Sequence, residues 1–569
     1  MAAKPIALLA LVILAACAGL VVLATGSEPE QAPGVGGTVE PSGPGPGSPP
    51  PPRLVGETDP GETIDFSLVL KRRDAELQKF LKDVQDPESP EYRRFLDAEA
   101  YGERFGLDER ALARLRADLE KEGLRVTRAL PQRTSLGVSG TAADVKRVFG
   151  VQLRDFVDGR GKPFHAPEID PVVPAALRGA VDTVSGLNTR QVIRPKAVPN
   201  GEPLMPDTVA TAYNTKPLRD MGINGEGQTV AIMSFDTFDP ADVAEFDRLS
   251  GTEGPEVEKI PVNGGVETPG EGAVEVNLDI DTIRTVAPKA QILDYEAPGT
   301  NFLDDLADMT DQIVADGRAD TASLSWGTCE VPELLEEPDV TRVLQSLEAA
   351  VAQGVTIYEA SGDWGAFCGI SQDESVIDEI PDFPGSSPNL VTVGGTLLNL
   401  REDGTYLDET AWEDVFARRA TGGGNSISVP RPEFQQGEGV DNPSSNGMRQ
   451  IPDVAGPADP KSGILTVTDG EPAAGGGTSQ AAPFFAGAML LVRQYVEKES
   501  GRKGLGYTNP LFYQLAEGED GDVIFHDITK GGDLLHNAGP GWDYATGLGT
   551  PDVFNLAKGI NGLLDQQGG

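Results

Sequence analysis

Two adjoining stretches decide the fold class, QTVAIMSF at residues 228–235 and DPADVAEFDRLS at residues 239–250. The first is an apolar run typical of a strand, and the second carries its apolar residues at helical spacing. The alternation continues through AQILDYEA (290–297), FLDDLADMTDQIVADG (302–317), TASLSWG (321–327), DVTRVLQSLEAAVAQG (339–354), GVTIYEASG (354–362) and LVTVGGTLL (390–398). It predicts βαβ units and therefore an α/β fold, with a mostly parallel sheet and helices on both faces. In such sheets active sites gather at the carboxyl ends of the strands.

The region before this alternation predicts a compact α+β domain. Between residues 61 and 190 the chain shows helical spacing in AELQKFLKDVQ (75–85), PEYRRFL (90–96), DERALARLRADLEKEGL (108–124) and TAADVKRVFG (141–150). Short β-like runs, RVTRAL (125–130) and SLGVSG (135–140), lie between these helices. Charged residues are frequent throughout this region, and its composition alone fits any small domain.

The N-terminus predicts export. Residues 5–25, PIALLALVILAACAGLVVLAT, form an apolar run behind Lys4, which is typical of a secretory signal or a membrane anchor. Leu14-Ala15-Ala16-Cys17 resembles a bacterial lipobox, so a lipoprotein, an uncleaved anchor and an ordinary signal peptide all stay open. Residues 26–60 predict a linker, since PSGPGPGSPPPP (41–52) contains only Pro, Gly and Ser. We therefore expect an extracellular or cell-envelope protein, with tethering through the N-terminus as one form.

The charge and the counts of His and Cys disfavour some classes of function and predict a disulfide. The chain has 46 basic and 89 acidic residues and a formal charge of −43, which argues against binding to nucleic acid because that affinity comes from Lys and Arg. Only three His occur, so His-based metal sites are disfavoured. In an exported chain the two cysteines of the body, Cys329 and Cys368, predict one disulfide. The alternative is two unrelated buried thiols.

A nucleophile candidate is Ser479. It lies in GGGTSQAAP (475–483), directly before the apolar helical run FFAGAMLLVRQYV. This predicts a position at a helix N-terminus, where backbone N–H groups favour developing negative charge. The alternative is a plain N-cap serine after a glycine loop.

Three carboxylates are candidates for the accompanying chemistry. Glu275 and Asp279 in EVNLD are four residues apart and would share one helix face, where like charges raise each other's pKa values. The alternative is a solvated acidic face. Asp363 in SGDWG (361–365) follows a strand-like run and would lie at a strand's carboxyl end, where a simple Asx-turn is the alternative.

The motifs together resemble one family, the sedolisin (serine-carboxyl) peptidases, and most closely the kumamolisin-like members. The resemblance extends from about residue 61 to 560. Its motifs occur in the family's order: EVNLD (275–279), SLSWG (323–327), SGDWG (361–365), FPGSSPNLVTVGGT (383–396), TGGGNS (421–426), IPDVAGPADP (451–460) and GGTSQAAP (476–483).

The resemblance implies a subtilisin-like fold and roles for individual residues. Ser479 would be the nucleophile, Glu275 its general base, Asp279 the residue that orients the base, and Asp363 the oxyanion partner. Trp326 and Asp382 would be supporting residues near the cleft. One departure is Ser234, which stands about where family members often carry a Glu that extends the proton network.

The resemblance also implies an activation prodomain and a calcium site. Residues 61–195 would be the inhibitory prodomain, removed by a cut between 190 and 205, and residues 196–569 the catalytic domain. The late acidic loop would hold one Ca²⁺ through the side chains of Asp527 and Asp543 and the carbonyls of Ile528, Gly539 and Gly541. Read without the resemblance, this loop is an acidic turn.

The resulting expectation is a monomeric, exported, acid-acting serine endopeptidase made as a zymogen, with protein or peptide substrates. A tripeptidyl-peptidase of the same family stays open, as does an inactive surface binding protein on this scaffold. A Ser-His-Asp enzyme is disfavoured because none of His165, His526 and His536 has the sequence surroundings of a triad histidine.

Overall fold

The computed structural model describes residues 52–159, 161–190, 194–195, 203–335, 337–368 and 379–568. The apolar run at 5–25, Cys17 and the linker up to residue 51 lie outside this part of the chain. Within the described residues, none of the helices has the length and apolar character needed to cross a membrane. We call residues 52–190 the N-terminal lobe and residues 203–568 the C-terminal lobe.

The C-terminal lobe is built around an eight-stranded sheet with the order β10-β11-β9-β12-β14-β16-β17, and β22 also pairs with β16. Neighbouring strands are parallel except β16 and β17. The predicted mostly parallel sheet is therefore confirmed. The strands are β9 (Thr229–Ser234), β10 (Glu258–Pro261), β11 (Gln291–Glu296), β12 (Thr321–Leu324), β14 (Thr356–Ala360), β16 (Val391–Leu400), β17 (Tyr406–Ala411) and β22 (Val454–Pro457).

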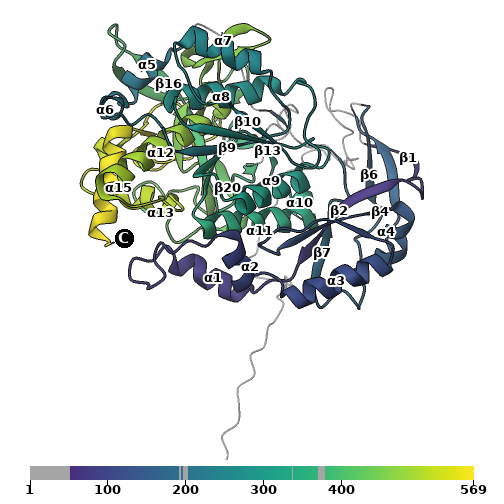
Figure 1. The fold of residues 1–569 in the computed structure, drawn as a ribbon. Helices are drawn as coiled ribbons and strands as arrows, with labels where there is room; N and C mark the ends of the chain where they lie inside the picture. Colours follow the sequence, from purple (N-terminus) through teal and green to yellow (C-terminus); the bar gives the residue numbers. More distant parts are fainter. Residues whose placement is uncertain are drawn as a thin grey trace, which may run out of the picture. The chain divides into compact units, whose positions relative to one another are not determined.

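Helices cover both faces of this sheet (Figure 1). Alternate residues of β9 point to opposite sides, so Val230 and Ile232 join one apolar core while Ala231 and Met233 join the other. Helices α8 and α12 lie on the first side, and α9 and α11 lie on the second. The four helices are α8 (Ala273–Val286), α9 (Phe302–Asp316), α11 (Pro338–Gln353) and α12 (Thr478–Ser500).

The strand order changes direction between β9 and β12. After β9 the chain forms β10 at the outer edge of the sheet and then β11 between β10 and β9, whereas β12, β14 and β16 follow one another on the opposite side of β9. In open parallel sheets, this reversal leaves a crevice at the carboxyl ends of the adjacent strands. The segments that leave β12 and β14 at this edge, around Ser325 and Asp363, are therefore expected to border a site.

The N-terminal lobe has two antiparallel sheets, β3-β4-β2-β7 and β1-β5-β6. We expected a linker up to residue 60, but β1 pairs with β5 and the fold begins at Arg53. The elements are β1 (Arg53–Glu57), β2 (Thr63–Leu70), α1 (Asp74–Asp83), α2 (Ala98–Arg104), α3 (Glu109–Lys121), β3 (Arg125–Arg128), β4 (Ser135–Thr141), α4 (Ala142–Phe149), β5 (Leu153–Val157), β6 (Pro163–Pro167) and β7 (Val181–Ser185).

One helix expected from the sequence is absent. Residues 90–96 form turns and irregular backbone. Arg93, in the middle of this segment, has a left-handed φ of 56°, which interrupts right-handed helical geometry. The Arg93 guanidinium instead donates to the carbonyls of Gly504 and Leu505 in the C-terminal lobe. Tertiary contacts therefore outweigh the helical spacing of this segment.

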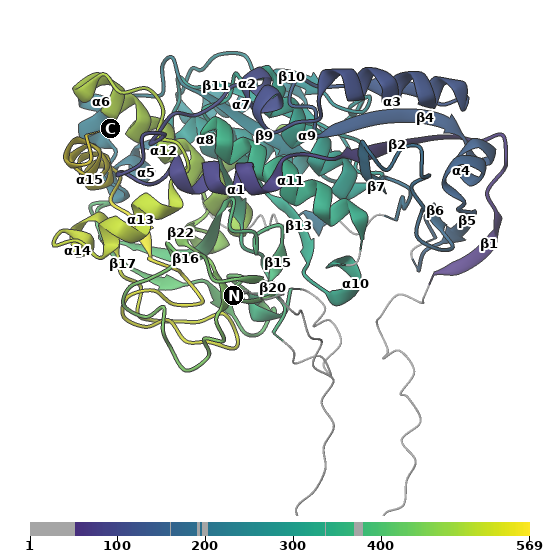
Figure 2. The same ribbon diagram turned by 90° about the horizontal axis from the view of Figure 1, so that it is seen from below.

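The N-terminal lobe packs on α9 and α11 (Figures 1 and 2). Leu77 and Phe80 of α1 and Tyr101 of α2 belong to the same apolar core as the residues of these two helices. Leu96 N–H donates to the carbonyl of Ala352 at 3.0 Å. The two lobes thus share a buried core that holds the N-terminal lobe in place.

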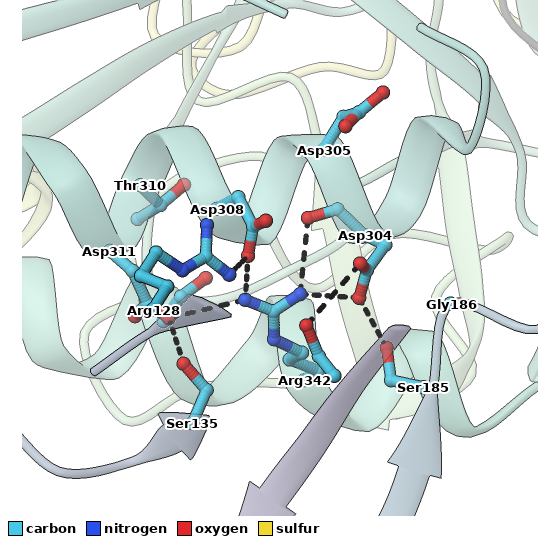
Figure 3. Close-up of polar contacts among 12 residues, drawn as sticks. Arg128, Ser135, Ser185, Gly186, Asp304, Asp305, Asp308, Thr310, Asp311 and Arg342 are labelled. Atoms are coloured by element: carbon cyan, nitrogen blue, oxygen red, sulfur yellow. Dashed lines mark hydrogen bonds and ion pairs between the residues drawn. The ribbon is translucent and has the colours of Figure 1, made fainter. Parts of the chain in front are cut away.

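A buried polar cluster lies within this contact (Figure 3). Arg342 of α11 makes ion pairs with Asp304 and Asp308 of α9, and Arg128 of the N-terminal lobe also pairs with Asp308. The N-terminal lobe adds hydroxyl donors: Ser185 donates to Asp304 at 2.6 Å and Ser135 donates to Asp311 at 2.8 Å.

Carboxylates outnumber cations in this cluster, which also includes Asp339 in the first turn of α11, where it accepts a hydrogen bond from the N–H of Gly186. Burial, helped by the negative charge of Asp304, raises the pKa of Asp339 to about 7. Burial also raises the pKa of Asp311. A raised pKa gives a stabilising contribution that is present below the ordinary value near 3.8 and lost as pH rises through the shifted one. For Asp339 the docked state is therefore favoured by acid and weakened as pH rises through about 7.

We expect Arg128→Met to loosen the N-terminal lobe, because it removes one cation from a buried carboxylate cluster. Breaking a buried pair costs about 3–5 kcal/mol. Arg342 still pairs with Asp308, so we take the lower end, about 100-fold in the undocked population. Chymotrypsin digestion of the full chain at neutral pH measures this population. Arg125→Met, on the exposed side of β3, is the control, and equal digestion rates for the two variants would contradict the role of the pair.

Candidate active site

Ser479 lies in the first turn of α12 and is fully buried. The helix starts here because Gly477, with φ 91°, turns the chain in a way that other residues resist, and the apolar run that follows is buried as far as Val492. The helix N-terminus favours negative charge at this point. Within the described residues, the Ser479 hydroxyl makes no hydrogen bond. Catalytic hydrogen bonds of this kind often tighten only when substrate binds.

Glu275 and Asp279 lie one turn apart on α8, and both are 0% exposed. This burial excludes the solvated acidic face that was the alternative. Burial, and then the charge of Glu275, raises the pKa of Asp279 well above its ordinary value. Two carboxyl groups held this way cannot both ionise easily, so the pair retains a proton to higher pH than a free Asp.

Ser325 connects this carboxyl pair to the serine. It lies between β12 and β13 (Trp326–Cys329), at the sheet edge identified above. Its hydroxyl is 2.6 Å from Asp279 Oδ1, to which it donates, and 3.3 Å from the main-chain carbonyl oxygen of Ser479. We did not single out Ser325 from the sequence, although it is the second serine of the SLSWG motif.

Asp363 lies in the turn after β14 and is also 0% exposed. Its Oδ1 accepts hydrogen bonds from the backbone N–H of Thr478 at 2.8 Å and from the Thr478 hydroxyl at 2.9 Å. Thr478 directly precedes Ser479, so the Asp363 carboxyl is fixed beside the candidate nucleophile. Thr478 is a second residue that the sequence did not single out.

The supporting residues expected from the sequence border the same site. Trp326 is almost fully buried, and a Cβ atom on Gly272, at the start of α8, would come within 2.7 Å of its ring. Asp382 on β15 (Asp382–Phe383) lies against Gly362, where a Cβ atom would come within 2.2 Å of the carboxylate and φ is 112°. Only glycine fits there.

The predicted disulfide joins two of these segments. Cys329 at the end of β13 is bonded to Cys368, with their Cα atoms 5.5 Å apart. The bond closes a loop of 39 residues, which is worth about 3–4 kcal/mol in the chain-entropy model. It ties the strand that carries Trp326 to the turn that follows Asp363.

A short strand from the segment between the lobes adds to β13. The backbone of β8 (Arg194–Pro195) runs antiparallel to Trp326 and Gly327. Extended peptides bind proteins in this way when they pair with an exposed strand edge. The edge of β13 beside the site is therefore able to bind extended backbone.

Ser234, the position that departs from the resembling motif, contacts a carboxyl group on the neighbouring strand. Its hydroxyl donates to Asp294 Oδ1 of β11 at 2.5 Å. Asp294 is fully buried, and burial followed by the charge of Glu296 raises its pKa well above the ordinary value. The charge of Asp294 in turn contributes to the raised pKa of Asp279.

The expected calcium ligands come together in one loop. Asp543 Oδ2 accepts from the N–H of Gly539 at 2.9 Å, and Asp527 Oδ2 accepts from the N–H of Gly541 at 3.3 Å. Ile528 beside them is buried. Burial raises the pKa of Asp543 to about 7. The described residues hold no cluster of three or more His, Cys, Asp or Glu suited to a metal, so a cation here would need backbone carbonyls as well.

Comparison with known proteins identifies relatives of both lobes. Residues 53–190 match the pro-kumamolisin activation domain, and residues 259–509 match the subtilase family. The chain is 32% identical over 527 residues to kumamolisin of Bacillus sp. (strain MN-32), covering 88% of this chain and 92% of that protein. It is 27% identical over 550 residues to tripeptidyl-peptidase 1 of Mus musculus, covering 89% and 92%.

A solved structure supports the fold. It is Pseudomonas sedolisin, a serine-carboxyl proteinase, complexed with two molecules of pseudo-iodotyrostatin. The TM-score is 0.56 at 26% sequence identity, and the match covers 64% of this chain and 99% of that one. The C-terminal lobe therefore has the subtilisin-like arrangement that the sequence predicted.

Proposed function

The chain belongs to the sedolisin family of serine peptidases and carries its activation domain in front, and from this premise we propose that it is an exported, acid-acting serine-carboxyl endopeptidase made as a zymogen. Ser479 is the nucleophile, Glu275 the general base, Asp279 the residue that orients Glu275, and Asp363 the oxyanion partner. The support for the proposal is the complete burial of all four side chains, together with the hydrogen bonds that link Asp279 to Ser479 through Ser325 and Asp363 to Thr478 at the start of α12.

In the proposed reaction the Ser479 hydroxyl attacks a peptide carbonyl while Glu275 takes its proton. The carbonyl carbon becomes tetrahedral, the amine leaves with a proton, and water hydrolyses the acyl-enzyme. Asp279 keeps a proton because burial and the charge of Glu275 raise its pKa, and it can donate that proton in a hydrogen bond to the ionised base. Asp363, in its protonated form, donates to the oxyanion.

These roles require an acidic working range. Glu275 must be ionised and Asp363 protonated, and free Glu and Asp titrate near 4.3 and 3.9. We expect a bell-shaped profile of kcat/KM for the mature enzyme, with its maximum below about pH 6. The measurement uses a neutral peptide from about pH 2 to about pH 9. A maximum at neutral or alkaline pH would point to a His-type base and contradict the mechanism.

We favour internal cleavage over tripeptide release. The support is the higher identity to kumamolisin than to tripeptidyl-peptidase 1, 32% against 27%. A mixed library of peptides with blocked N-termini separates the two. An endopeptidase cleaves blocked peptides inside the chain, whereas a tripeptidyl-peptidase releases tripeptides only from free N-termini. An inactive binding protein on this scaffold would cleave neither and would leave Ser479 unlabelled by a serine-directed probe.

The N-terminal lobe is proposed to act as an intramolecular inhibitor until a cut between residues 190 and 205 frees the catalytic domain. Its support is the match to an activation domain and the pairing of β8 with β13 beside the site. In this reading the domains are 61–195 and 196–569, with the first extended back to Arg53 by β1. Export, through a leader at residues 1–25, stays a proposal drawn from the apolar run.

A Ca²⁺ ion fits the loop around Asp543. Two carboxylates flank the Gly539–Gly541 turn and accept hydrogen bonds from its N–H groups, with Asp543 buried and Asp527 exposed to solvent. Oxygen donors of this kind suit a hard cation. Asp527, Asp543 and the carbonyls of Ile528, Gly539 and Gly541 would hold it, and its contribution would be to stabilise the fold.

Removing calcium should lower the melting temperature of the mature domain. A ligand that binds only the folded state stabilises it by about 2.7 kcal/mol at a hundred times its Kd. We expect metal-free protein to melt at higher temperature as Ca²⁺ is added, and Asp543→Ala to lose that response. Asp520→Ala, at an exposed acid before α14 (Gly521–Ile524), is the control. If Ca²⁺ leaves the melting curve of the parent protein unchanged, the proposed calcium site is wrong.

A further inference from the structure

A cation lies beside the candidate oxyanion residue. Arg419 Nη1 is 3.7 Å from Asp363 Oδ2. Arg419 belongs to β19 (Arg419–Ala420), which pairs with β18 (Glu413–Asp414) in a hairpin, and the N–H of Ala420 donates to the main-chain carbonyl of Asp363 at 3.1 Å. The hairpin is therefore fixed to the same turn that carries the carboxyl group. Arg419 lies two residues before the TGGGNS motif (421–426) and belongs to none of the motifs that carry the family resemblance.

The guanidinium is held in place from one side and open on another. It stacks over the ring of Trp364 with its Cζ atom 4.2 Å from the ring centroid. Its side chain is 30% exposed, whereas Asp363 is 0% exposed. Arg419 thus reaches from solvent to a buried carboxyl group, and its stacking on the Trp364 ring holds the guanidinium in place.

The two oxygens of Asp363 face different partners. Oδ1 already accepts two hydrogen bonds from Thr478, so the proton needed for an oxyanion contact belongs on Oδ2. Oδ2 is the atom that faces Arg419. A cation at this distance favours the ionised form of an acid, and it therefore opposes the protonation that the proposed mechanism requires.

We infer that Arg419 is a positioning residue that acts through Asp363 and sets the alkaline limit of the enzyme's activity. It orients Oδ2 and holds the carboxyl group in the ionised, inactive form until the pH is low enough for a proton to displace the ion pair. The inference rests on the proposed function, because it assigns to Asp363 the oxyanion role. Beyond that function, it assigns to the charge of Arg419 the control of the pH at which Asp363 becomes protonated and can donate to the oxyanion.

Other ionisable side chains lie on the elements around this turn, and they do not replace Arg419 in the argument. The carboxylate of Asp382 lies against Gly362 and disfavours a second negative charge nearby. Buried Glu359 lies on β14, the strand that leads into this turn. Further groups are Glu275 on α8, Asp533 and His536 on the loop after β25 (Phe525–His526), Glu379 beside Asn425, and the exposed Arg418 of the same hairpin. The acids among them favour protonation of Asp363, which Arg419 opposes.

The test compares pH profiles of kcat/KM for the mature enzyme and its variants. Arg419→Gln removes the charge, and we expect the alkaline limb to move to higher pH by about 0.5–1 unit, the lower end of the effect of an adjacent Arg because the pair is partly exposed. The maximum value should stay within about threefold of the parent. Arg419→Lys keeps a charge and should keep the limb near its original position. Arg418→Gln, with the same charge change on the next residue, should leave the profile unchanged.

Each outcome decides the inference. A limb that does not move in Arg419→Gln overturns it, as does an equal shift in Arg418→Gln or in Arg419→Lys. A folded Arg419→Gln enzyme that is inactive at every pH overturns it too, since the guanidinium would then contact substrate directly. Two outcomes would instead count against the proposed function: a parent enzyme whose profile has no alkaline limb, or a Ser479→Ala variant that is as active as the parent.

A second measurement needs no variant. The ion pair is partly exposed, so salt should screen it, whereas the buried Glu275 and Asp279 are screened much less. Raising ionic strength from about 0.02 M to about 0.5 M should move the alkaline limb of the parent enzyme to higher pH and leave the acid limb in place. An alkaline limb that is independent of salt would contradict the role of Arg419.

Discussion

Replacing Ser479 with alanine should abolish peptide hydrolysis and leave the chain at full length when the pH is lowered. Loss of the nucleophile in a serine peptidase costs about 10⁶-fold in kcat. The fold should survive, because the Ser479 hydroxyl makes no hydrogen bond among the described residues and its removal leaves no donor or acceptor unpaired. Activity and processing should therefore disappear while the melting temperature stays close to that of the parent chain.

The comparison is made on purified chains, each acidified alone and followed by gel electrophoresis over time. Ser500→Ala, on the last turn of the same helix, is the control and should be processed like the parent. If the Ser479→Ala chain is shortened at the parent rate in the absence of other proteases, self-cleavage is wrong.

Acid should trigger this processing at the active site and not by undocking the N-terminal lobe. At the interface the raised pKa of Asp339, about 7, makes acid favour the docked state. Protonation of Asp363 has the opposite consequence, because it completes the proposed oxyanion site. The cut between the lobes should therefore precede release of the N-terminal lobe, and the two parts should stay together after cleavage at acidic pH.

Replacing Glu275 with glutamine should lower kcat by about 10²–10⁴-fold, the usual contribution of a positioned general base. The amide has nearly the same shape but cannot accept the serine proton. The same substitution should lower activity but leave the stability of the fold unchanged or increase it. The charge of Glu275 is one cause of the raised pKa of Asp279, and a raised pKa costs stability as pH rises through it.

Glu275→Gln should accordingly melt at a temperature equal to or above that of the parent at neutral pH, while its activity is nearly lost. Glu271→Gln, at an exposed position just before α8, is the control and should change neither. Full activity in Glu275→Gln would contradict the assignment of the base. A large loss of stability at neutral pH would show that the carboxyl pair is structural.

Much of the fold follows from local sequence signals. The strands around Val230, Ile292 and Ile357 are short apolar runs between amphipathic helices, and this alternation is enough to predict a parallel sheet. Ser479 and Asp363 can also be predicted from the sequence, because glycines mark a helix start beside Ser479 and a strand end beside Asp363. What connects them is not local, because Ser325 and Thr478 become functional neighbours only when two strand ends meet the start of α12.

The acidic face of α9 is a feature whose burial the sequence does not indicate. Asp304, Asp308 and Asp311 occur at helical spacing, and in a chain of charge −43 they have the pattern of a solvated helix face. They are instead buried under the N-terminal lobe, with Arg342 and Arg128 between them. Nothing in the spacing indicates this, because the covering lobe is more than a hundred residues away in the chain.

Helix α12 carries the proposed nucleophile, Ser479, at the start of a long buried segment. Its residues are buried from Thr478 to Val492, and they contact strands of the sheet as well as α8. Segments of this kind exchange their amide hydrogens only when the whole domain opens, whereas exposed loops exchange through local fluctuations. Hydrogen exchange at the amides of this helix should therefore report global unfolding, and catalytic competence should be lost together with the fold on heating, without an inactive but otherwise native intermediate.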